Sequence, residues 1–216
     1  MNLALFDFDG TITETDTWTP FMRLAVPRLG PAAWALLAPV ARGFGVGVVS
    51  GSRGRAIAVR VALAGQPAEA IRRVGREYAS SALPRAVRPD VLQRIDWHRG
   101  RGDRVVVVSA ALDVYLEPWC RAHELEVVCT RLEERDGRLT GRYRSPDCCG
   151  AEKVRRLRAV VDPTQYDTVY AYGDSADDRE LLECAHEPFF RGRPLTDWAE
   201  VGGARHPRER REARPG

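Results

Sequence analysis

The residues whose types and spacing most directly suggest chemistry stand at the start of the chain. Asp7 and Asp9 follow the apolar run Leu3–Phe6 and are followed at once by Gly10 and Thr11, a pattern typical of a buried strand that ends in a turn. In an extended chain, side chains two residues apart share a face, so both carboxylates are predicted to point the same way. Two like charges this close repel each other unless a cation lies between them or one is protonated. The pattern therefore predicts a site for a divalent cation such as Mg2+, which prefers oxygen ligands.

Two later apolar runs also end in polar residues. The β-branched run 103–109 ends in Ser109, and the run 168–172 is followed by Gly173 and Asp174. Such runs are typical of central parallel strands. Helical patterns are predicted over residues 89–98, 115–125, 151–161 and 179–184. Alternating strands and helices predict an α/β fold, a doubly wound parallel sheet that binds ligands beyond the carboxyl ends of its strands.

Other stretches predict smaller elements. A third strand is predicted over 126–129, and Asp136-Gly137 within 130–143 is a hairpin signal. Residues 188–191 are interpreted as a last, edge strand. Between 21 and 83 the pattern predicts several short helices, broken by prolines and by the glycine cluster 43–54. The apolar run 31–41 is too short to span a bilayer, which needs ~20 residues, and indicates a buried or, less simply, a membrane-contacting helix.

Lys153 is the only lysine among 33 basic residues. An ammonium group is a compact point charge that fits a crowded site of phosphate and carboxylate groups, where the planar guanidinium of arginine does not substitute freely. Lys153 is therefore a candidate site residue. The alternative is a chance lysine on a solvated helix face.

Composition indicates a soluble globular chain of 216 residues, enough for one core with an insertion. With five cysteines and no export signal before the first strand, reduced thiols and a cytoplasmic location are expected. Cys148 and Cys149 are interpreted as loop or partly buried thiols rather than zinc ligands.

Residues 17–88 carry a net charge of +9 and the tail 203–216 a net +3, so the rest is net −9. This split would draw an anionic substrate or an acidic membrane surface to the junction; the alternative is a solvated arginine-rich surface.

Taken in order, these motifs resemble those of the haloacid dehalogenase (HAD) superfamily, subclass IB, whose best-known type is phosphoserine phosphatase. The resemblance covers residues 1–190 and rests on Asp7-Phe-Asp9-Gly-Thr-Ile-Thr13, Val-Val-Ser109, Lys153 and Gly173-Asp174-Ser-Ala-Asp-Asp178. It implies a Rossmann-like HAD core of residues 1–16 and 89–202 and an inserted helical cap of the C1 type at 17–88. Residues 203–216 have too little apolar surface to fold and are predicted to be disordered.

The resemblance also implies a role for each motif residue. Asp7 would attack phosphorus to form an aspartyl-phosphate, and Asp9 would protonate the leaving group and then activate water. Mg2+ would be held by Asp7, the backbone carbonyl of Asp9, and Asp174. The phosphate would be bound by Gly10, Thr11, Ser109, Ala110 and Lys153. Asp177 and Asp178 would support the site, although Asp178 could also be a solvated first-turn carboxylate.

The sequence specifies the identity of the leaving group less closely than it specifies the phosphate-transfer chemistry. In phosphoserine phosphatases a cap arginine and a glutamate bind the amino acid; Arg60 and Asp16 occupy similar places here, and Ala-Ala rather than Gly-Gly follows Ser109. The apolar stretch 34–49, followed by Arg53 and Arg55, also resembles the cap of phosphatidylglycerophosphate phosphatases. The expected substrate is a small or lipid-like phosphomonoester, with phosphoserine phosphatase, lipid phosphatase and a catalytically idle binding protein as alternatives. Weak membrane contact through the cap is left open; no nucleic acid and no obligate protein partner are expected.

Overall fold

The computed structural model describes residues 1–26 and 51–202. A six-stranded sheet has the order β3-β2-β1-β6-β7-β8 and is parallel apart from the pairing of β7 with β8. Its strands are β1 (Leu3–Phe6), β2 (Arg104–Leu112), β3 (Glu126–Thr130), β6 (Val169–Gly173), β7 (Glu187–Phe190) and β8 (Arg193–Pro194). The predicted α/β class and parallel sheet are confirmed.

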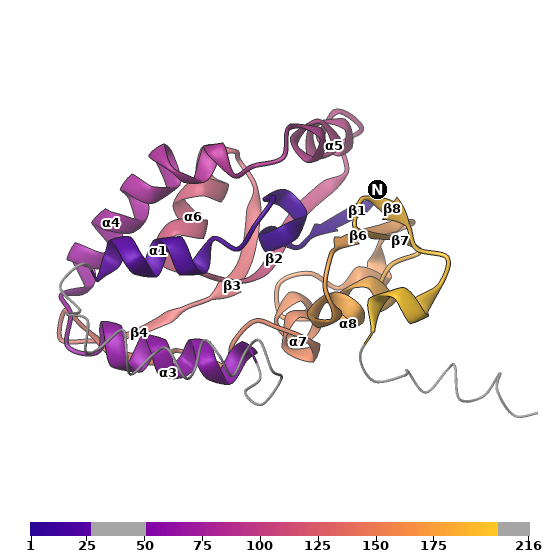
Figure 1. Ribbon diagram of the computed structural model, residues 1–216. Coiled ribbons are helices and arrows are strands. Elements are labelled where there is room, and N and C mark those ends of the chain that lie inside the picture. The colour runs from indigo at the N-terminus through magenta and orange to yellow at the C-terminus, as the bar shows by residue number, and fades with distance from the viewer. Residues whose placement is uncertain (27–50, 203–216) are drawn as a thin grey trace, which may run out of the picture.

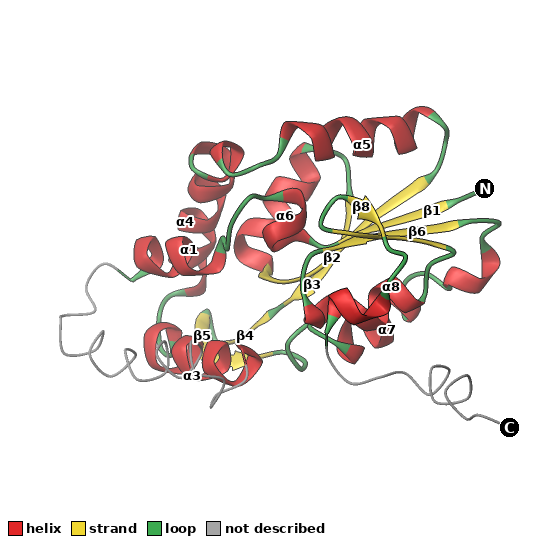
Figure 2. Cartoon of the chain, turned by 45° about the vertical axis from the view of Figure 1, so that its right-hand side comes forward, coloured by secondary structure: helices red, strands yellow, loops and turns green. Residues whose placement is uncertain are grey.

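Helices cover both faces of the sheet (Figures 1 and 2). They are α5 (Pro89–Gly100) and α6 (Asp113–Ala122) on one face, and α7 (Ala151–Arg158) and α8 (Arg179–Glu183) on the other. Alternation within β1 explains the two layers, because Ala4 and Phe6 join the apolar cluster of α5 and α6 whereas Leu3 and Leu5 join that of α7 and α8. Burying a side chain such as Phe6 stabilises the fold by about 1.5–3 kcal/mol.

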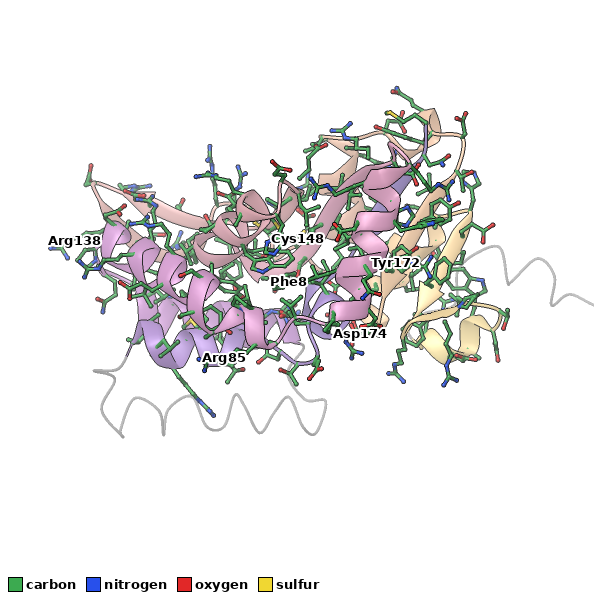
Figure 3. All side chains as sticks on the ribbon, turned by 90° about the horizontal axis from the view of Figure 1, so that it is seen from above. Phe8, Arg85, Arg138, Cys148, Tyr172 and Asp174 are labelled. Carbon is green, nitrogen blue, oxygen red and sulfur yellow. The ribbon has the colours of Figure 1, made fainter. Side chains whose placement is uncertain are left out.

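A second group of elements extends from one end of the sheet, at the left of Figure 1. It contains α1 (Trp18–Ala25), α3 (Gly51–Leu63), α4 (Ala68–Ser81) and the hairpin of β4 (Leu132–Arg135) and β5 (Arg138–Tyr143). In Figure 3 Arg138 marks the outer end of this hairpin, well away from Tyr172 and Asp174 on the sheet side. Asp136 and Gly137 both have positive φ, 52° and 74°, as the predicted two-residue turn requires.

Several helices and strands begin or end at residues other than those predicted from the sequence. β2 continues three residues beyond Ser109, with an irregularity in its pairing to β3. Helix α3 begins at Gly51 and contains the buried Gly54, so the predicted glycine break over 43–54 is wrong at its end. The strand predicted over 188–191 is present as β7, but it is not at the edge, because a turn at Arg191 and Gly192, both with positive φ, returns β8 along the outer side of β7.

The predicted apolar helix 31–41 and the basic tail 203–216 lie outside the described residues. Within the described ranges, no helix is both long enough and apolar enough to cross a membrane.

Candidate active site

The carboxyl edge of the sheet brings the strand-end residues to one level. Phe6 lies opposite Val107 of β2 and Tyr172 of β6, and the Asp7 amide donates to the Tyr172 carbonyl at 3.0 Å. Asp7 is therefore one residue beyond that level, and Ser109 and Asp174 are two beyond it. Three neighbouring strands thus bring these polar residues to the same edge, although Ser109 lies within β2 and not at its end.

Lys153 lies between two carboxylates. Its Nζ donates to Asp7 Oδ1 and to Asp178 Oδ1, each at 2.5 Å, and its side chain is only 3% exposed. Burial alone would lower the pKa of Lys153, but the charges of Asp178 and Asp7 raise it above its usual value. The ammonium is therefore charged, and the alternative of a lysine on a solvated face is wrong.

Asp178 is fully buried, so it is not the solvated carboxylate that was the alternative interpretation. Its Oδ2 accepts from the amides of Asp174 and Ser175 at 3.0 and 3.1 Å and from the Ser175 hydroxyl at 3.1 Å. Burial alone would raise the pKa of Asp178, but the charge of Lys153 and these hydrogen bonds hold it below its ordinary value. Asp178 is thus an ionised anchor for both Lys153 and the loop that carries Asp174.

Three carboxylates at this edge could share a cation. Ligand oxygens of Asp7, Asp174 and Asp178 lie within 4.8 Å of one another. Burial, and then the charge of Asp178, raise the pKa of Asp7 well above its ordinary value despite Lys153, and the same two causes raise the pKa of Asp174. A bound divalent cation would remove this penalty, and an all-oxygen donor set fits Mg2+.

Gly10 is required where the turn Phe8–Ile12 approaches Asp174. Its φ is +79°, and a Cβ placed on it would lie 2.2 Å from Asp174 Oδ2. Any larger residue would displace the carboxylate or the turn. The backbone beside Gly10 thereby fixes the position of one candidate metal ligand.

Asp9 lies in this turn rather than in the strand, because β1 ends at Phe6. The predicted strand therefore stops short of Asp9, although the backbone of Asp9 itself is extended, with φ −70° and ψ 122°. Its Oδ1 accepts from the Thr17 amide at 3.0 Å and from the Thr17 hydroxyl at 2.5 Å. Burial raises the pKa of Asp9 to about 6, and the hydrogen bonds from Thr17 oppose the rise.

Comparison with known proteins decides the family. The model of the haloacid dehalogenase-like hydrolase family matches residues 4–183. The chain belongs to this family. The hydrolase is 34% identical over 205 residues to protein CicA of Caulobacter vibrioides, covering 89% of this chain and 88% of that protein. It is 29% identical to a 2-hydroxy-3-keto-5-methylthiopentenyl-1-phosphate phosphatase of Exiguobacterium sp., covering 94% of this chain and 90% of the relative.

Solved structures share the fold. A protein of unknown function from Bordetella pertussis Tohama I superposes on the hydrolase with a TM-score of 0.76 at 24% identity, over 87% of this chain and 88% of that one. A substrate-bound phosphoserine phosphatase gives a TM-score of 0.64 at 20% identity, over 87% and 84% of the two chains. The predicted HAD fold of the phosphoserine phosphatase type is confirmed.

The remaining predicted phosphate ligands differ in their surroundings. The Ser109 hydroxyl is buried and accepts from the Ala111 amide at 3.2 Å, whereas Ala110 is half-buried. The Thr11 hydroxyl is buried and, among the described residues, has no hydrogen-bond partner. Ser109 retains its hydroxyl proton for a ligand, because in this contact its oxygen only accepts.

Both residues predicted to recognise the substrate are exposed. Asp16 is exposed, and its carboxylate accepts from the Trp18 and Thr19 amides at the start of α1, each at 3.1 Å. The Arg60 side chain is exposed, and its backbone packs over Gly141. In the described part of the chain, neither contacts the group of Asp7, Lys153 and Asp178.

Asp177 is exposed, and its carbonyl accepts from the Gly150 amide at 3.0 Å. It joins the loop of Asp174 to the start of the lysine-bearing helix α7. Its contribution to the site is therefore made by the backbone.

A cavity of about 400 Å3 opens beside Gly10 and Asp174. Its basic lining residues are Arg88, Arg94 and Arg191. The site residues Gly10, Thr11 and Asp174 line this cavity, whereas Asp7 and Lys153 do not.

Thr17 and Asp147 lie near the site and were not singled out from the sequence, and Arg55 was named only as part of the basic segment after residues 34–49. Thr17 binds Asp9, and Arg55 pairs with Asp147 in the loop before α7. Arg55 is one of 32 arginines, and Asp147 has no spacing that marks it. The pattern Ser175-x-x-Asp178, in contrast, is a readable capping signature that predicts the turn after β6.

Proposed function

We propose that the protein is a Mg2+-dependent phosphatase that hydrolyses a small organic phosphomonoester through a phosphorylated Asp7. The family match and the phosphatase among its relatives support the enzyme class, phosphoric monoester hydrolase. The observation that carries the proposal is the buried ammonium of Lys153 between Asp7 and Asp178, beside Asp174. This arrangement offers a nucleophile, a positive charge for a phosphoryl group, and oxygen ligands for a cation.

Asp7 is the proposed nucleophile. Its carboxylate stands at the end of a rigid central strand, so its attacking oxygen is held in one place. One oxygen is bound by Lys153, which leaves the other for attack on phosphorus. The Asp7–phosphorus bond would form as the bond to the leaving oxygen breaks, giving an acyl phosphate that water then hydrolyses.

Asp9 is the proposed acid and base. A carboxyl group with a pKa of about 6 can donate a proton to the leaving oxygen and, as its conjugate base, take one from the attacking water near neutral pH. Thr17 would orient this carboxylate through its two hydrogen bonds.

Mg2+ fits the group of Asp7, Asp174 and Asp178, because two buried carboxylates and the half-buried carboxylate of Asp174 share a single nearby ammonium. Asp7 and Asp174 would be ligands, with Asp178 supporting, and the Asp9 carbonyl would complete the set. When bound, the cation would neutralise the charge between the nucleophile and the phosphate. The phosphoryl oxygens would be held by Lys153, the Ser109 hydroxyl, and backbone amides of Gly10, Thr11 and Ala110.

The proposed substrate class is small organic phosphomonoesters in general. The exposed Arg60 and the helix-capping Asp16 give no specific support to phosphoserine. The lipid alternative rests on residues 34–49, which lie outside the described ranges. We further infer that residues 17–88 form the cap, whose described helices α1, α3 and α4 would act as a lid over the site.

An aryl phosphate assay tests the proposal. The parent protein should hydrolyse p-nitrophenyl phosphate with Mg2+ and lose this activity in EDTA. Asp7→Asn should lower the rate by at least about 1,000-fold, because the amide is not a nucleophile. With a 32P-labelled substrate, acid-quenched parent protein should carry label that hydroxylamine releases, as expected for an acyl phosphate.

The matched control is Asp96→Asn, which neutralises an exposed carboxylate on α5. It should keep the full rate and the labelling. Retained activity in Asp7→Asn, or label that resists hydroxylamine, would contradict the assignment of the nucleophile.

A further inference from the structure

A shielded ion pair joins helix α3 to the loop that precedes the lysine-bearing helix. Arg55 Nε and Nη2 both donate to Asp147 Oδ2, at 3.0 and 2.8 Å. The two side chains are 20% and 6% exposed, whereas those of Arg72 and Glu134, which join α4 to the hairpin, are 45% and 32% exposed. Screening by water weakens exposed pairs, so the Arg55–Asp147 pair is the stronger of the two connections.

Asp147 uses its other oxygen for a different element. Its Oδ1 accepts from the Thr130 hydroxyl, at the end of β3, at 2.8 Å. The same hydroxyl oxygen accepts from the Cys148 amide at 3.0 Å. Asp147 is therefore the point where α3, β3 and the loop before α7 are held together.

The conformation of this loop determines the position of the Lys153 backbone. The Cys149 amide donates to the Asp147 carbonyl at 2.8 Å, and the Gly150 amide donates to Asp177 at 3.0 Å. The Lys153 amide in turn donates to the Gly150 carbonyl at 3.0 Å. Short-range backbone hydrogen bonds thus order the loop from Asp147 to the first turn of α7, which carries Lys153.

The rest of α3 is held elsewhere. Just beyond its carboxyl end, the Gly65 amide donates to Leu139 and the Leu139 amide donates to Gln66, at 2.8 and 2.9 Å, and Gly141 packs closely under Arg60. These contacts attach that end to the hairpin. Arg55 attaches the amino-terminal half of α3 to the site loop.

We propose that Arg55 and Asp147 are positioning residues, whose ion pair between α3 and the loop before α7 holds Lys153 in place at Asp7 and Asp178. The kinetic part of this inference rests on the proposed phosphatase function. When α3 is docked, the loop is fixed and Lys153 can bind the phosphoryl group. When the pair is broken, the loop relaxes and Lys153 no longer has one fixed position.

The kinetic test compares Arg55→Gln, Asp147→Asn and the double variant with the parent, using p-nitrophenyl phosphate and saturating Mg2+. Each single variant should lower kcat by about 10- to 100-fold with KM changed less than about 3-fold, because the chemistry depends on placement within about 1 Å. The double variant should be no worse than either single one, since both remove the same interaction. Arg55→Lys should recover only part of the loss, because an ammonium cannot reproduce the two-pronged contact.

Two controls separate position from charge. Arg73→Gln removes an exposed arginine of α4, and Arg72→Gln breaks the exposed pair to the hairpin. Both should keep kcat within about 2-fold. A rise in KM confined to the Arg55 variants, with Asp147→Asn unchanged, would make Arg55 a substrate contact and overturn the proposal.

A second measurement needs no activity. Cys149 is half-buried two residues after Asp147, Cys184 is the other half-buried thiol, and Cys120, Cys129 and Cys148 are buried. In a Cys184→Ser background, the rate at which a thiol reagent labels Cys149, divided by the thiolate fraction measured for the same variant, reports on opening of the loop. The division is needed because Asp147 raises and Arg55 lowers the pKa of Cys149. Arg55→Gln and Asp147→Asn should raise this rate at least about 5-fold, and the two controls should leave it unchanged.

Unchanged labelling in both ion-pair variants would refute the proposal whatever the kinetics show. If the parent protein hydrolyses no phosphomonoester, the proposed function fails, while the labelling still decides whether the pair holds the loop. Circular dichroism of each variant identifies any that does not fold, and in that case Arg55→Lys, which retains the charge, supplies the labelling comparison.

Discussion

At the scale of single residues, the site depends on charges that burial makes sensitive to their neighbours. Lys153 is charged because two buried carboxylates bind it, and Asp178 is ionised because Lys153 and three hydrogen-bond donors surround it. Asp9 is in a different situation, since burial raises its pKa to about 6 although the hydrogen bonds from Thr17 and the charge of Arg55 oppose the rise. Two carboxylates of one motif thus have separate environments, which suits separate roles.

Replacing Gly10 should act on metal binding through Asp174. Gly10→Ala places a Cβ where Asp174 Oδ2 lies and also strains a backbone with φ of +79°. We expect the Mg2+ concentration for half-maximal activity to rise roughly 10- to 100-fold, as when the support of a metal ligand is removed. Gly102→Ala is the control, because its φ is +75° and nothing lies within 4 Å of its Cβ. It should show a similar stability loss, about 1–2 kcal/mol, with unchanged Mg2+ dependence; equal Mg2+ effects in both would contradict the prediction.

Asp9→Asn should stabilise the folded protein at neutral pH while abolishing activity. The folded-state pKa of Asp9, about 6, exceeds the ordinary value of 3.8, so the wild-type carboxyl costs stability as pH rises from about 4 to 6. The variant escapes this cost, and its free energy of unfolding at pH 7 should exceed that of wild type by up to about 3 kcal/mol. Urea unfolding in EDTA at pH 4 and pH 7 measures the difference. A gain equally large at pH 4 would show that the cause is not ionisation of Asp9.

At the scale of elements, helices from distant parts of the chain approach each other closely. Gly75 of α4 lies against the backbone of α6, where a Cβ would come 2.0 Å from the Val114 carbonyl oxygen. Tyr78 of α4 and Tyr115 of α6 pack edge to face, with ring centroids 5.4 Å apart. The tyrosine hydroxyls also reach Thr17, the partner of Asp9. Packing of α4 on α6 therefore supports the side chain that orients Asp9.

Gly75→Ala should destabilise the protein although alanine is the better helix former. In an open helix the change gains about 1 kcal/mol, but here the added Cβ collides with the Val114 backbone, and overpacking of this kind costs about 1–3 kcal/mol. Gly100→Ala, at the end of α5, meets nothing within 4 Å and should be neutral or slightly stabilising. Thermal unfolding of the two variants measures the contrast, and a stabilised Gly75→Ala would refute the packing argument.

At the scale of the whole molecule, the core is continuous across the predicted boundary between core and cap. One apolar cluster includes Phe8 of the site turn, Phe21 and Tyr78 from the inserted segment, and Tyr115 and Trp119 from α6. The inserted helices therefore do not form an apolar core of their own in the described residues. Movement of this segment would have to break contacts with α6 as well as the pair of Arg55 and Asp147.

The uneven charge distribution has an internal use. Arg55 and Arg72, from the basic segment 17–88, pair with Asp147 and Glu134 outside it. Some of the charges in the basic segment are therefore neutralised by carboxylates of the same molecule and do not attract a partner. Arg53, Arg60 and Arg73 are exposed, in keeping with the alternative of a solvated arginine-rich surface for part of the segment.

The sequence by itself determined the sheet, the family and the residues that meet at its edge. Apolar runs ending in Asp7, Ser109 and Asp174 are local signals, because a parallel strand buried on both faces needs a continuous apolar run and its polar end must lie beyond the sheet. The single lysine stood out because every other basic residue is an arginine. The hydrogen-bonding role of Asp178 in the turn after β6 was also predictable, since its spacing from Ser175 is that of a capping box.

Only the tertiary structure decided what surrounds those residues. Thr17 lies 8 residues from Asp9, and Arg55 lies 92 from Asp147. No periodicity encodes such pairs, because they depend on how α3 and α4 dock on the hairpin and α6. Likewise Arg60 had a suitable type and place in the sequence, but the helix turns its side chain to solvent while its backbone packs on Gly141. Local pattern thus fixes which groups stand at a strand end, whereas burial, ionisation and support of those groups follow from long-range packing.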